Sequence, residues 1–411
     1  MACRWGSRWS MVARHSKPRI RTVMDLTFTE SEEAFRQEVR AWLEANVPTE
    51  PLPSGDTAEG FALHVEWEKK LHAARYSAVS WPVEYGGRGA NLWEWLIFEE
   101  EYYRAGAPNR VSQNGIFLLA PTLFEYGTDE QKARVLPAMA AADVLWGQCW
   151  SEPGAGSDLA SLRSTATRTE GGWLLNGQKT WCTRGAFCDW GFGLFRTDPD
   201  ARKHAGLTYF MMDLKAPGVT VAPVERLDGD VGFADVFYEN VFVSDADVLG
   251  GVNEGWKVAM ATASSERGLT LRSPGRFTAT AARLIKLYEA MGRPVDATIR
   301  QRVARAWMDA EAYNLHTLST VTRMLKGEKI GAEASANKIL WSEMDVAIHE
   351  AALDLIGPTR ELDEYSASAT EDGAWLKGFQ FALAGPIYAG TNEIQRNVVA
   401  QRVLGLPRGK R

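Results

Sequence analysis

Residues 148–158 read Gln-Cys-Trp-Ser-Glu-Pro-Gly-Ala-Gly-Ser-Asp and are the most informative stretch of the chain. Small residues and hydroxyls at this density let a backbone approach a ligand closely and present N–H and O–H donors to carbonyl or phosphate oxygens. Alone, the stretch fits a structural turn as well as a binding loop. Two further segments also combine glycine, a hydroxyl and an aromatic ring: residues 176–183, Asn-Gly-Gln-Lys-Thr-Trp-Cys-Thr, and residues 388–396, Tyr-Ala-Gly-Thr-Asn-Glu-Ile-Gln-Arg. Three such segments together favour a shared ligand site.

The chain before this stretch has helical periodicity. Thr29 and Glu32 form a capping-box pattern, and apolar residues from Phe35 to Leu43 follow at the spacing of one helix face. We therefore predict an N-terminal α-helical domain over residues 24–145. Further helices are expected at about residues 57–75, 91–103, 114–126 and 129–141.

Near residue 146 the sequence changes to short runs of Thr, Val, Phe, Tyr and Trp that are broken by glycine. Asn176-Gly177 predicts a hairpin turn, followed by a strand that carries Trp181 and Thr183. Pro217-Gly218 predicts a second turn. Residues 146–252 are thus expected to form a central antiparallel β domain of modest size.

Helical periodicity returns at Gly255 and continues to the end of the chain, with breaks at glycine-proline pairs. Residues 253–411 therefore predict a C-terminal α-helical bundle. The expected fold class is α+β, with a helical domain, an antiparallel β domain and a helical bundle in that order.

The charge distribution excludes some classes of function. The 411 residues carry a formal net charge of −6, and residues 1–23 hold six basic residues and no acid, which leaves −12 on the remainder. A duplex-binding surface needs a net basic footprint, so we expect no nucleic-acid partner. No apolar run approaches the roughly 20 residues that span a bilayer, so we expect no membrane insertion.

Residues 1–23 are expected to be a disordered basic leader outside the fold. They resemble a transit peptide superficially, but Met24 and the acidic segment after it read as a natural protein start. The four cysteines form no CxxC pair, which fits free thiols in a reducing compartment, so a cytoplasmic location is expected. The six histidines show no HExxH motif and no i, i+4 pair, so we expect no metal site.

Three common motifs are absent from the sequence. There is no GxGxxG after a strand, no GxxxxGK[ST] and no GxSxG. An enzyme with this sequence must therefore bind its cofactor without a Rossmann site or a P-loop, and acyl hydrolysis by the usual serine route is not indicated.

Together, the three segments resemble those of the acyl-CoA dehydrogenase family of flavoproteins. The block at residues 151–158 is highly specific to that family, and the Trp-x-Thr at 181–183 and the Gly-Thr-Asn-Glu-Ile-Gln-Arg run at 390–396 agree with it. The order of domains also matches from Met24 onward. The resemblance implies an FAD-dependent oxidoreductase that acts on a CH–CH group and converts an acyl-CoA to a trans-2-enoyl-CoA.

The resemblance also implies roles for single residues. Three of them would line the isoalloxazine ring of FAD: Gln148, Trp150 and Ser151. Trp181 would shield one edge of the flavin, and Thr183 would hydrogen-bond near its reactive nitrogen. The other implied contacts are Gly156, Ser157, Gly390 and Thr391 for the cofactor, and Ser157, Arg267 and Ala389 for the coenzyme A ester. Many relatives have a branched aliphatic residue at position 150, so the Trp is a departure.

Dehydrogenation needs a base at the α-carbon of the thioester, in a site dry enough to make a carboxylate basic. In many relatives a glutamate follows the tyrosine of the C-terminal motif, but here Ala389 occupies that place. Other members carry the base in a Glu-Arg pair on the helix after the β domain, and Glu266-Arg267 matches it. The resemblance implies that Glu266 abstracts the α-proton while the flavin accepts the β-hydride. A solvated helix charge pair is the plainer alternative.

The implied electron acceptor is an electron-transfer flavoprotein. A segment that reaches the neighbouring subunit's FAD in many relatives is shortened here in residues 292–301. This leaves open a homo-oligomer (dimer or tetramer) or a heterotetramer with a second family member, and it resembles members from actinobacterial lipid and steroid catabolism. Two alternatives to a dehydrogenase also stay open: an oxygen-using acyl-CoA oxidase or flavin monooxygenase, and a non-catalytic partner subunit. The acyl pocket is expected between Glu99–Tyr103 and Gln113–Leu119, whose aromatic rings favour a branched or cyclic acyl group.

Overall fold

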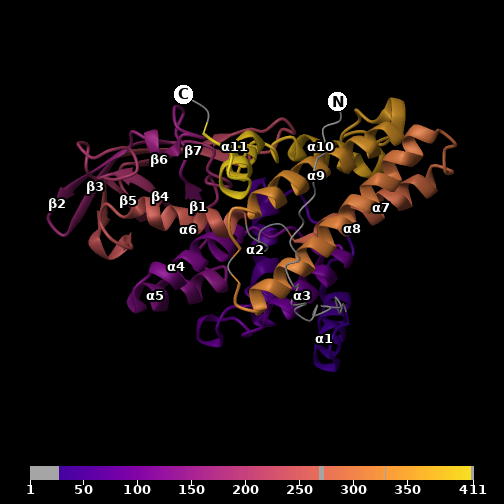
Figure 1. Ribbon diagram of the computed structural model, residues 1–411, viewed down its shortest axis with the longest axis horizontal. Helices are drawn as coiled ribbons and strands as arrows, with labels where there is room; N and C mark the ends of the chain where they lie inside the picture. The colour runs from indigo at the N-terminus through magenta and orange to yellow at the C-terminus, as the bar shows by residue number, and fades with distance from the viewer. Residues whose placement is uncertain (1–26, 268–272, 329, 409–411) are drawn as a thin grey trace, which may run out of the picture.

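The computed structural model describes residues 27–267, 273–328 and 330–408, and the side chains of residues 265–267 lie outside the described part. The predicted leader therefore also lies outside the described residues. Helices, a sheet and helices follow one another along the chain, in the predicted order. In Figure 1 the indigo N-terminal helices lie at the bottom, the sheet at the left, and the C-terminal helices along the top and right.

The N-terminal helices begin where the sequence supplies caps. The Thr29 hydroxyl accepts a hydrogen bond from Glu32 N–H, and the Glu32 carboxylate accepts one from Thr29 N–H, so the predicted capping box is confirmed. Buried Val39 and Leu43 then pack α1 into an apolar cluster with Trp67 and Tyr102. The elements are α1 (Glu30–Asn46), α2 (Ala58–Ala73), η1 (Val83–Tyr85), α3 (Leu92–Arg104), the π-helical turn η2 (Asn114–Leu119), α4 (Ala120–Tyr126) and α5 (Asp129–Ala140).

The strands form one sheet in the order β6-β7-β3-β2-β4-β5-β8, and β1 pairs with β4. Most neighbours are antiparallel, as predicted, but β1 runs parallel to β4, and β2 also meets β4 in one parallel pairing. The prediction of antiparallel pairing is wrong at these two places. Neither β1 nor β2 is followed directly by β4 in the chain, and the intervening segment lets the strands pair in parallel. The strands are β1 (Trp146–Cys149), β2 (Thr165–Thr169), β3 (Gly172–Lys179), β4 (Trp190–Arg196), β5 (Leu207–Asp213), β6 (Val219–Val224), β7 (Phe233–Ser244) and β8 (Val248–Leu249).

The predicted hairpin turn at Asn176-Gly177 is wrong. Both residues lie inside β3, where the register with β7 shifts between Leu175 and Gly177. Gly177 has a φ of +139° and leaves no room for a Cβ against Ser164, so the Asn-Gly pair marks a β-bulge here. The strand predicted at residues 181–183 is also wrong, because these residues form the loop that follows β3.

The C-terminal helices end at the breaks that the sequence predicts. Gly292-Arg293-Pro294 separates α7 from α8, and Gly385-Pro386 lies between α10 and α11. Phe277, Trp341 and Trp375 form the centre of the bundle with other buried apolar residues. The helices are α6 (Gly255–Arg267), α7 (Pro274–Ala290), α8 (Ala297–Leu325), α9 (Ala334–Ile356), α10 (Ala374–Ala382) and α11 (Asn392–Val398), and the π-helical turn η8 (Val399–Val403) follows α11.

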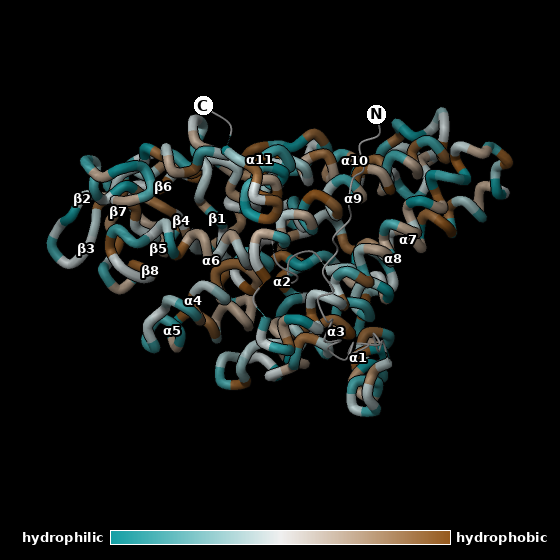
Figure 2. The backbone as a smooth tube through the Cα atoms, viewed as in Figure 1, coloured by the Kyte–Doolittle hydropathy of each residue, from teal (hydrophilic) through white to brown (hydrophobic). Residues whose placement is uncertain are grey.

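Helix α6 joins the N-terminal helices to the sheet. The Thr262 hydroxyl lies 2.8 Å from that of Thr122 on α4 and 3.3 Å from that of Tyr209 on β5. Val258 and Ala263 of the same helix enter the largest apolar cluster. Figure 2 shows hydrophobic colour along α9 and near α6, and hydrophilic colour at the outer loops. Within the described ranges, every helix is too short or too polar to cross a membrane.

Candidate functional site

The loop of residues 151–158 leaves the end of β1 and lies against the loop that follows β3. Thr180 N–H donates a hydrogen bond of 2.8 Å to the Ser151 carbonyl. Glu152 and Ala155 exchange two backbone hydrogen bonds of 3.0 Å each, which fold the loop back on itself. Gly156 and Ser157 then stand exposed at its tip. The structure thus brings together two of the three segments that the sequence analysis selected.

A buried ion pair holds this loop from inside the sheet. The Lys179 ammonium donates a hydrogen bond of 2.8 Å to the Glu152 carboxylate, and the Arg163 and Ser164 N–H groups donate to the same carboxylate at 2.6 and 2.9 Å. Burial lowers the pKa of Lys179, and Glu152 opposes this effect. Burial alone would raise the pKa of Glu152, but Lys179 and the backbone donors bring it below its ordinary value. The carboxylate is therefore ionised and its hydrogen-bonding capacity is filled.

Trp181 presents its indole ring at the surface beside this loop. Its side chain is 58% exposed, and its φ of +59° is a costly left-handed conformation for a bulky residue. Two backbone hydrogen bonds of 3.0 Å between Cys182 and Ala234 hold the loop, and Phe233 meets the indole edge-to-face at 5.7 Å. An exposed ring held in this way fits a flat ligand better than it fits core packing.

Hydroxyl and amide groups near Trp181 are free to bind a ligand. Within the described part of the chain, no hydrogen bond engages the side chains of Gln148, Ser151 or Thr183, and all three are partly exposed. Trp150 differs from them, because its ring is buried and meets Tyr209 edge-to-face at 6.3 Å in the core. An exposed indole beside unengaged polar groups suits a flat ligand that has a polar edge.

The third segment is held on α9. The Gln395 side-chain amide donates 2.8 Å to the Ala389 carbonyl, and the Thr391 hydroxyl caps α11 by accepting from Ile394 N–H. Ala389 and Gly390 have φ values of +57° and +77°, so this turn is tightly bent. Among the described residues, no hydrogen bond or ion pair joins residues 389–391 to the loops at 151 or 181. The third segment is therefore part of the C-terminal helical domain, and it is not bonded to the other two segments.

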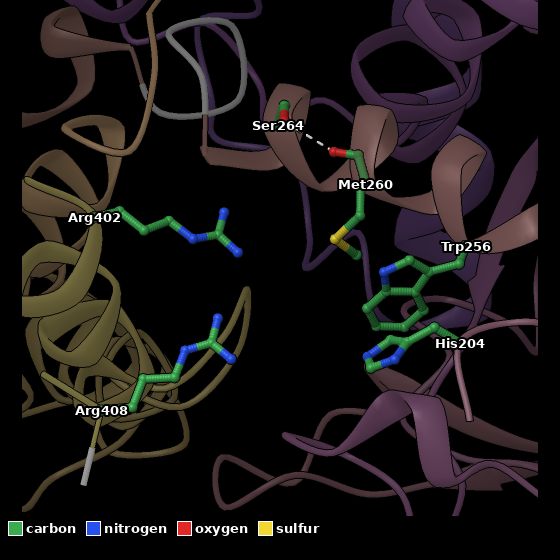
Figure 3. A pocket seen from close by; sticks show the side chains of 6 residues that line it. All are labelled: His204, Trp256, Met260, Ser264, Arg402 and Arg408. Atoms are coloured by element: carbon green, nitrogen blue, oxygen red, sulfur yellow. Dashed lines mark hydrogen bonds between the residues drawn. The ribbon is translucent and has the colours of Figure 1, made fainter. Parts of the chain in front are cut away.

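A cavity of about 460 Å³ opens along α6. Figure 3 shows Trp256, Met260 and Ser264 of α6 on one side of it, and the guanidinium groups of two arginines extending into it from the C-terminal segment. His204 lies edge-to-face with Trp256 at 4.5 Å. The residues that line the cavity are His204, Trp256, Met260, Ser264, Arg402 and Arg408.

The two arginines make this cavity a candidate anion site. Neither Arg402 nor Arg408 forms an ion pair with a residue in the described ranges. Guanidinium groups are weakly hydrated cations with donor pairs that match the oxygens of a phosphate. The cavity therefore suits a ligand that carries phosphates and an adjacent apolar part.

Glu266 and Arg267 are the last two residues of α6, and their side chains lie outside the described part. Position 267 follows Met260, which lines the cavity, by seven residues along the helix. Position 266 follows Thr262 by four residues along the helix. The predicted roles of both residues remain predictions.

Sequence reasoning missed the cavity. The i, i+4, i+8 spacing of Trp256, Met260 and Ser264 was available as a helical-face signal. Arg402 and Arg408 carried no such signal, because their approach to α6 depends on the tertiary fold.

The described residues contain no group of three or more His, Cys, Asp or Glu side chains that could hold a metal ion. Cys149, Cys182 and Cys188 are free, buried thiols, and Cys3 lies outside the described residues.

Comparisons with known proteins match nearly the whole chain to one family. Sequence models of the acyl-CoA dehydrogenase N-terminal, middle and C-terminal domains match residues 29–143, 147–241 and 253–404. The acyl-CoA dehydrogenase IpdE1 of Mycobacterium tuberculosis is 38% identical over 392 residues, which are 92% of this chain and 98% of that protein. The structure of the Tcur3481-Tcur3483 steroid ACAD is similar with a TM-score of 0.85 and 28% identity, covering 94% of this chain and 100% of that one. The ChsE4-ChsE5 complex of Mycobacterium tuberculosis is similar with a TM-score of 0.79 and 30% identity, at the same coverage.

Proposed function

Because the chain belongs to the acyl-CoA dehydrogenase family, we propose that it oxidises the Cα–Cβ bond of a steroid-related acyl-CoA to the trans-2-enoyl-CoA. The recognition of the family and of its three-part fold from sequence is confirmed, as is the assignment as an oxidoreductase of this kind. One observation carries the finer proposal: α6 has an arginine-lined cavity on one side, an apolar core on the other, and Glu266 at its end.

The family binds FAD, and we assign its flavin ring to the surface between the 151–158 and 180–184 loops. Trp181 would cover part of the ring, while the free side chains of Gln148, Ser151 and Thr183 would bond to its polar edge. Trp150 would support this surface from the core side. Gly156, Gly390 and Thr391 would border the cofactor through their backbones. When bound, FAD supplies the acceptor for the β-hydride.

Replacing Trp181 tests this assignment. For Trp181→Ala we expect FAD affinity to fall about 10-fold, because stacking on an indole contributes roughly 1–2 kcal/mol. The free energy of unfolding of the FAD-free protein should change by less than about 0.5 kcal/mol, because the ring is exposed. Fluorescence titration of FAD measures the first quantity. The same change at Tyr365, which is 90% exposed between α9 and α10, should leave FAD affinity unchanged; equal losses at both positions would refute the assignment.

The base in this proposal is Glu266. It removes the α-proton as the α,β double bond forms and the β-hydrogen leaves with its electron pair. The Ala389 N–H would bond to the thioester oxygen and so stabilise the negative charge that develops there. Arg267, the last residue of α6, would order the substrate near its thioester.

The arginine-lined cavity is assigned to the phosphates of coenzyme A, with Ser157 at the pantetheine or pyrophosphate part. We expect Arg402→Ala and Arg408→Ala each to raise KM for an acyl-CoA about 10-fold with little change in kcat, because a lost charge-assisted contact costs roughly 1.5–3 kcal/mol. Steady-state kinetics at low and moderate salt measure this, and the effect should shrink as salt screens the contact. Arg300→Ala, an exposed site on α8, is the matched control. A fall in kcat with KM unchanged would contradict the assignment.

The substrate class is best tested by anaerobic titration of the FAD-loaded protein with straight-chain, branched and steroid-side-chain acyl-CoAs. Bleaching of the flavin band by the steroid-type esters is the expected result. The similarity to the Tcur3481-Tcur3483 steroid ACAD supports this class. Bleaching by straight chains alone would overturn the substrate class and leave the reaction type intact.

We propose an electron-transfer flavoprotein as the acceptor. Release of peroxide at the turnover rate when the reduced protein meets air would instead indicate an oxidase or a monooxygenase. A colourless purified protein that does not take up FAD would indicate a non-catalytic partner subunit.

A mixed oligomer with a second family member is part of the proposal. Two similar structures are named as pairs of chains, Tcur3481-Tcur3483 and ChsE4-ChsE5. Helix α8 exposes the large apolar side chains of Trp307, Met308 and Leu315, as a surface between subunits would. Light scattering of the purified chain tests this point: a stable homotetramer by itself would remove the need for a second chain.

A further inference from the structure

A second cavity, of about 410 Å³, lies among the N-terminal helices. Its volume falls within the roughly 300–1,000 Å³ of small-molecule pockets. Flat, rigid aromatic walls favour an apolar ring over a flexible chain. The aromatic residues that line it are Tyr76, Trp81, Trp95, Phe98, Phe117 and Phe124.

Part of the wall of this cavity belongs to the apolar cluster that α6 also enters. Trp81 and Ile116 line it and also belong to the apolar cluster that contains Ala263 of α6. Glu99 lines it from α3 and shares a hydrogen bond with the Ser273 hydroxyl, which caps the N-terminus of α7. The cavity thus lies in the part of the apolar core that packs against α6, and Glu99 connects its wall to the start of α7.

On the polar wall of the cavity, Arg110 forms an ion pair with Glu68, and most of the hydrogen-bonding groups of both side chains are already engaged. Arg110 donates from Nε to both Glu68 carboxylate oxygens, at 2.9 and 2.8 Å, and from Nη2 to the Ser77 carbonyl at 2.6 Å. Glu68 also accepts from the N–H groups of Val111 and Ser112. Arg110 and Glu68 are therefore occupied with each other and with the backbone.

The carboxyl group of Glu99 can still form further hydrogen bonds. Its side chain is buried, with 6% exposure, and its partner is the Ser273 hydroxyl, whereas a carboxyl group can make several hydrogen bonds. Burial raises the pKa of Glu99 to about 7, although Arg110 and the Ser273 hydroxyl act to lower it. Near neutral pH this group can therefore both donate and accept. Trp95, on the same cavity wall, has a buried Nε1 without a hydrogen-bond partner among the described residues.

Unsatisfied polar groups in an aromatic cavity are costly unless a ligand completes them. We propose that this cavity holds the ring portion of the acyl group, and that Glu99, assisted by Trp95, selects for a hydroxyl or carbonyl oxygen on that ring. The inference rests on the proposed function and narrows it to oxygenated cyclic acyl-CoAs. A plain hydrocarbon ring would fill the same space, leave Trp95 Nε1 unpaired and leave Glu99 with the Ser273 hydroxyl as its partner.

Matched pairs of CoA thioesters test this directly. The probes are propanoyl-CoA esters with one or two saturated rings, each made with and without a ring hydroxyl or ring ketone. The FAD-loaded protein should show a kcat/KM about 10–100-fold higher for the oxygenated member, because its loss leaves buried polar groups unpaired. Isothermal titration of the same pairs into the FAD-loaded Glu266→Gln protein gives Kd values without turnover, and the same preference is expected.

Three variants locate the effect. Glu99→Leu should bring the ratio for each pair to about 1, and Glu99→Gln, which keeps hydrogen bonding, should retain part of it. Glu100→Gln is the matched control, because this neighbour on α3 is exposed and pairs with Arg36. Equal kcat/KM and Kd within every pair for the parent protein would overturn the inference while leaving the dehydrogenase assignment intact. If no ester binds or bleaches the flavin, the proposed function itself fails. If Glu99→Leu does not fold, the kcat/KM and Kd ratios of the parent protein and of Glu99→Gln still test the inference.

Discussion

Glu266→Gln is expected to lower kcat by about 10²–10⁴-fold while the protein remains yellow and binds acyl-CoA. An amide fills the same space as the carboxylate but cannot accept the α-proton, so the loss should appear in chemistry and not in KM. Ala389 stands where many relatives carry a glutamate in the C-terminal motif, and this departure supports our proposal that the base is Glu266. Anaerobic stopped-flow reduction of the flavin measures the chemical step separately from product release.

A control beside the same helix shows whether the loss is specific. Glu254→Gln changes an exposed carboxylate immediately before α6, and its rate should stay within about twofold of the parent. Arg267 gives a further check, because in our proposal it orders the substrate and does not take the proton. Arg267→Met should therefore raise KM more than it lowers kcat. Dehydrogenation at the parental rate by Glu266→Gln would show that the base is another residue.

Local patterns predicted the order of the elements well. The cap formed by Thr29 and Glu32 and the break at Gly292-Arg293-Pro294 depend on neighbouring residues, so the sequence alone contains them. The Asn176-Gly177 pair failed as a predictor because glycine is also required where two backbones approach closely. Here Ser164 occupies the space that a side chain would need, and the pair lies in a bulge. Local sequence does not distinguish the two cases.

Part of the candidate site could likewise be predicted from the sequence, and part could not. Residues 151–158 and 181–183 were selected as one site, and the hydrogen bond between Thr180 and Ser151 places their loops side by side. The left-handed backbone of Trp181 could not be predicted, because its conformation is imposed by the pairing of Cys182 with Ala234 on another strand. Glu99 was expected to border the acyl pocket, but its burial and its spare hydrogen bonds depend on the packing of α3 against α7. Chemistry that depends on what surrounds a residue is visible only in the fold.

The second large effect is expected at the buried ion pair beneath the 151–158 loop. Lys179→Met should lower the free energy of unfolding by about 3–5 kcal/mol, because it leaves the Glu152 carboxylate buried without its counterion. FAD affinity should fall in parallel, since Glu152 fixes the loop that begins at Ser151 through the Arg163 and Ser164 N–H groups. Urea denaturation followed by tryptophan fluorescence measures the stability, and flavin fluorescence measures the binding.

The charge itself, rather than the lost methylene packing, should account for most of this effect. If so, Lys179→Met combined with Glu152→Gln will be less destabilised than the sum of the two single changes, by about 0.5–3 kcal/mol. Lys203→Met is the matched control: it removes an ion pair of 3.1 Å to Asp158 at the other end of the same loop, where both side chains are more than half exposed. It should cost less than about 1 kcal/mol, because exposed pairs contribute little. Additive losses at Lys179 and Glu152 would mean that the two side chains stabilise the loop independently, and that the buried pair does not act as a unit.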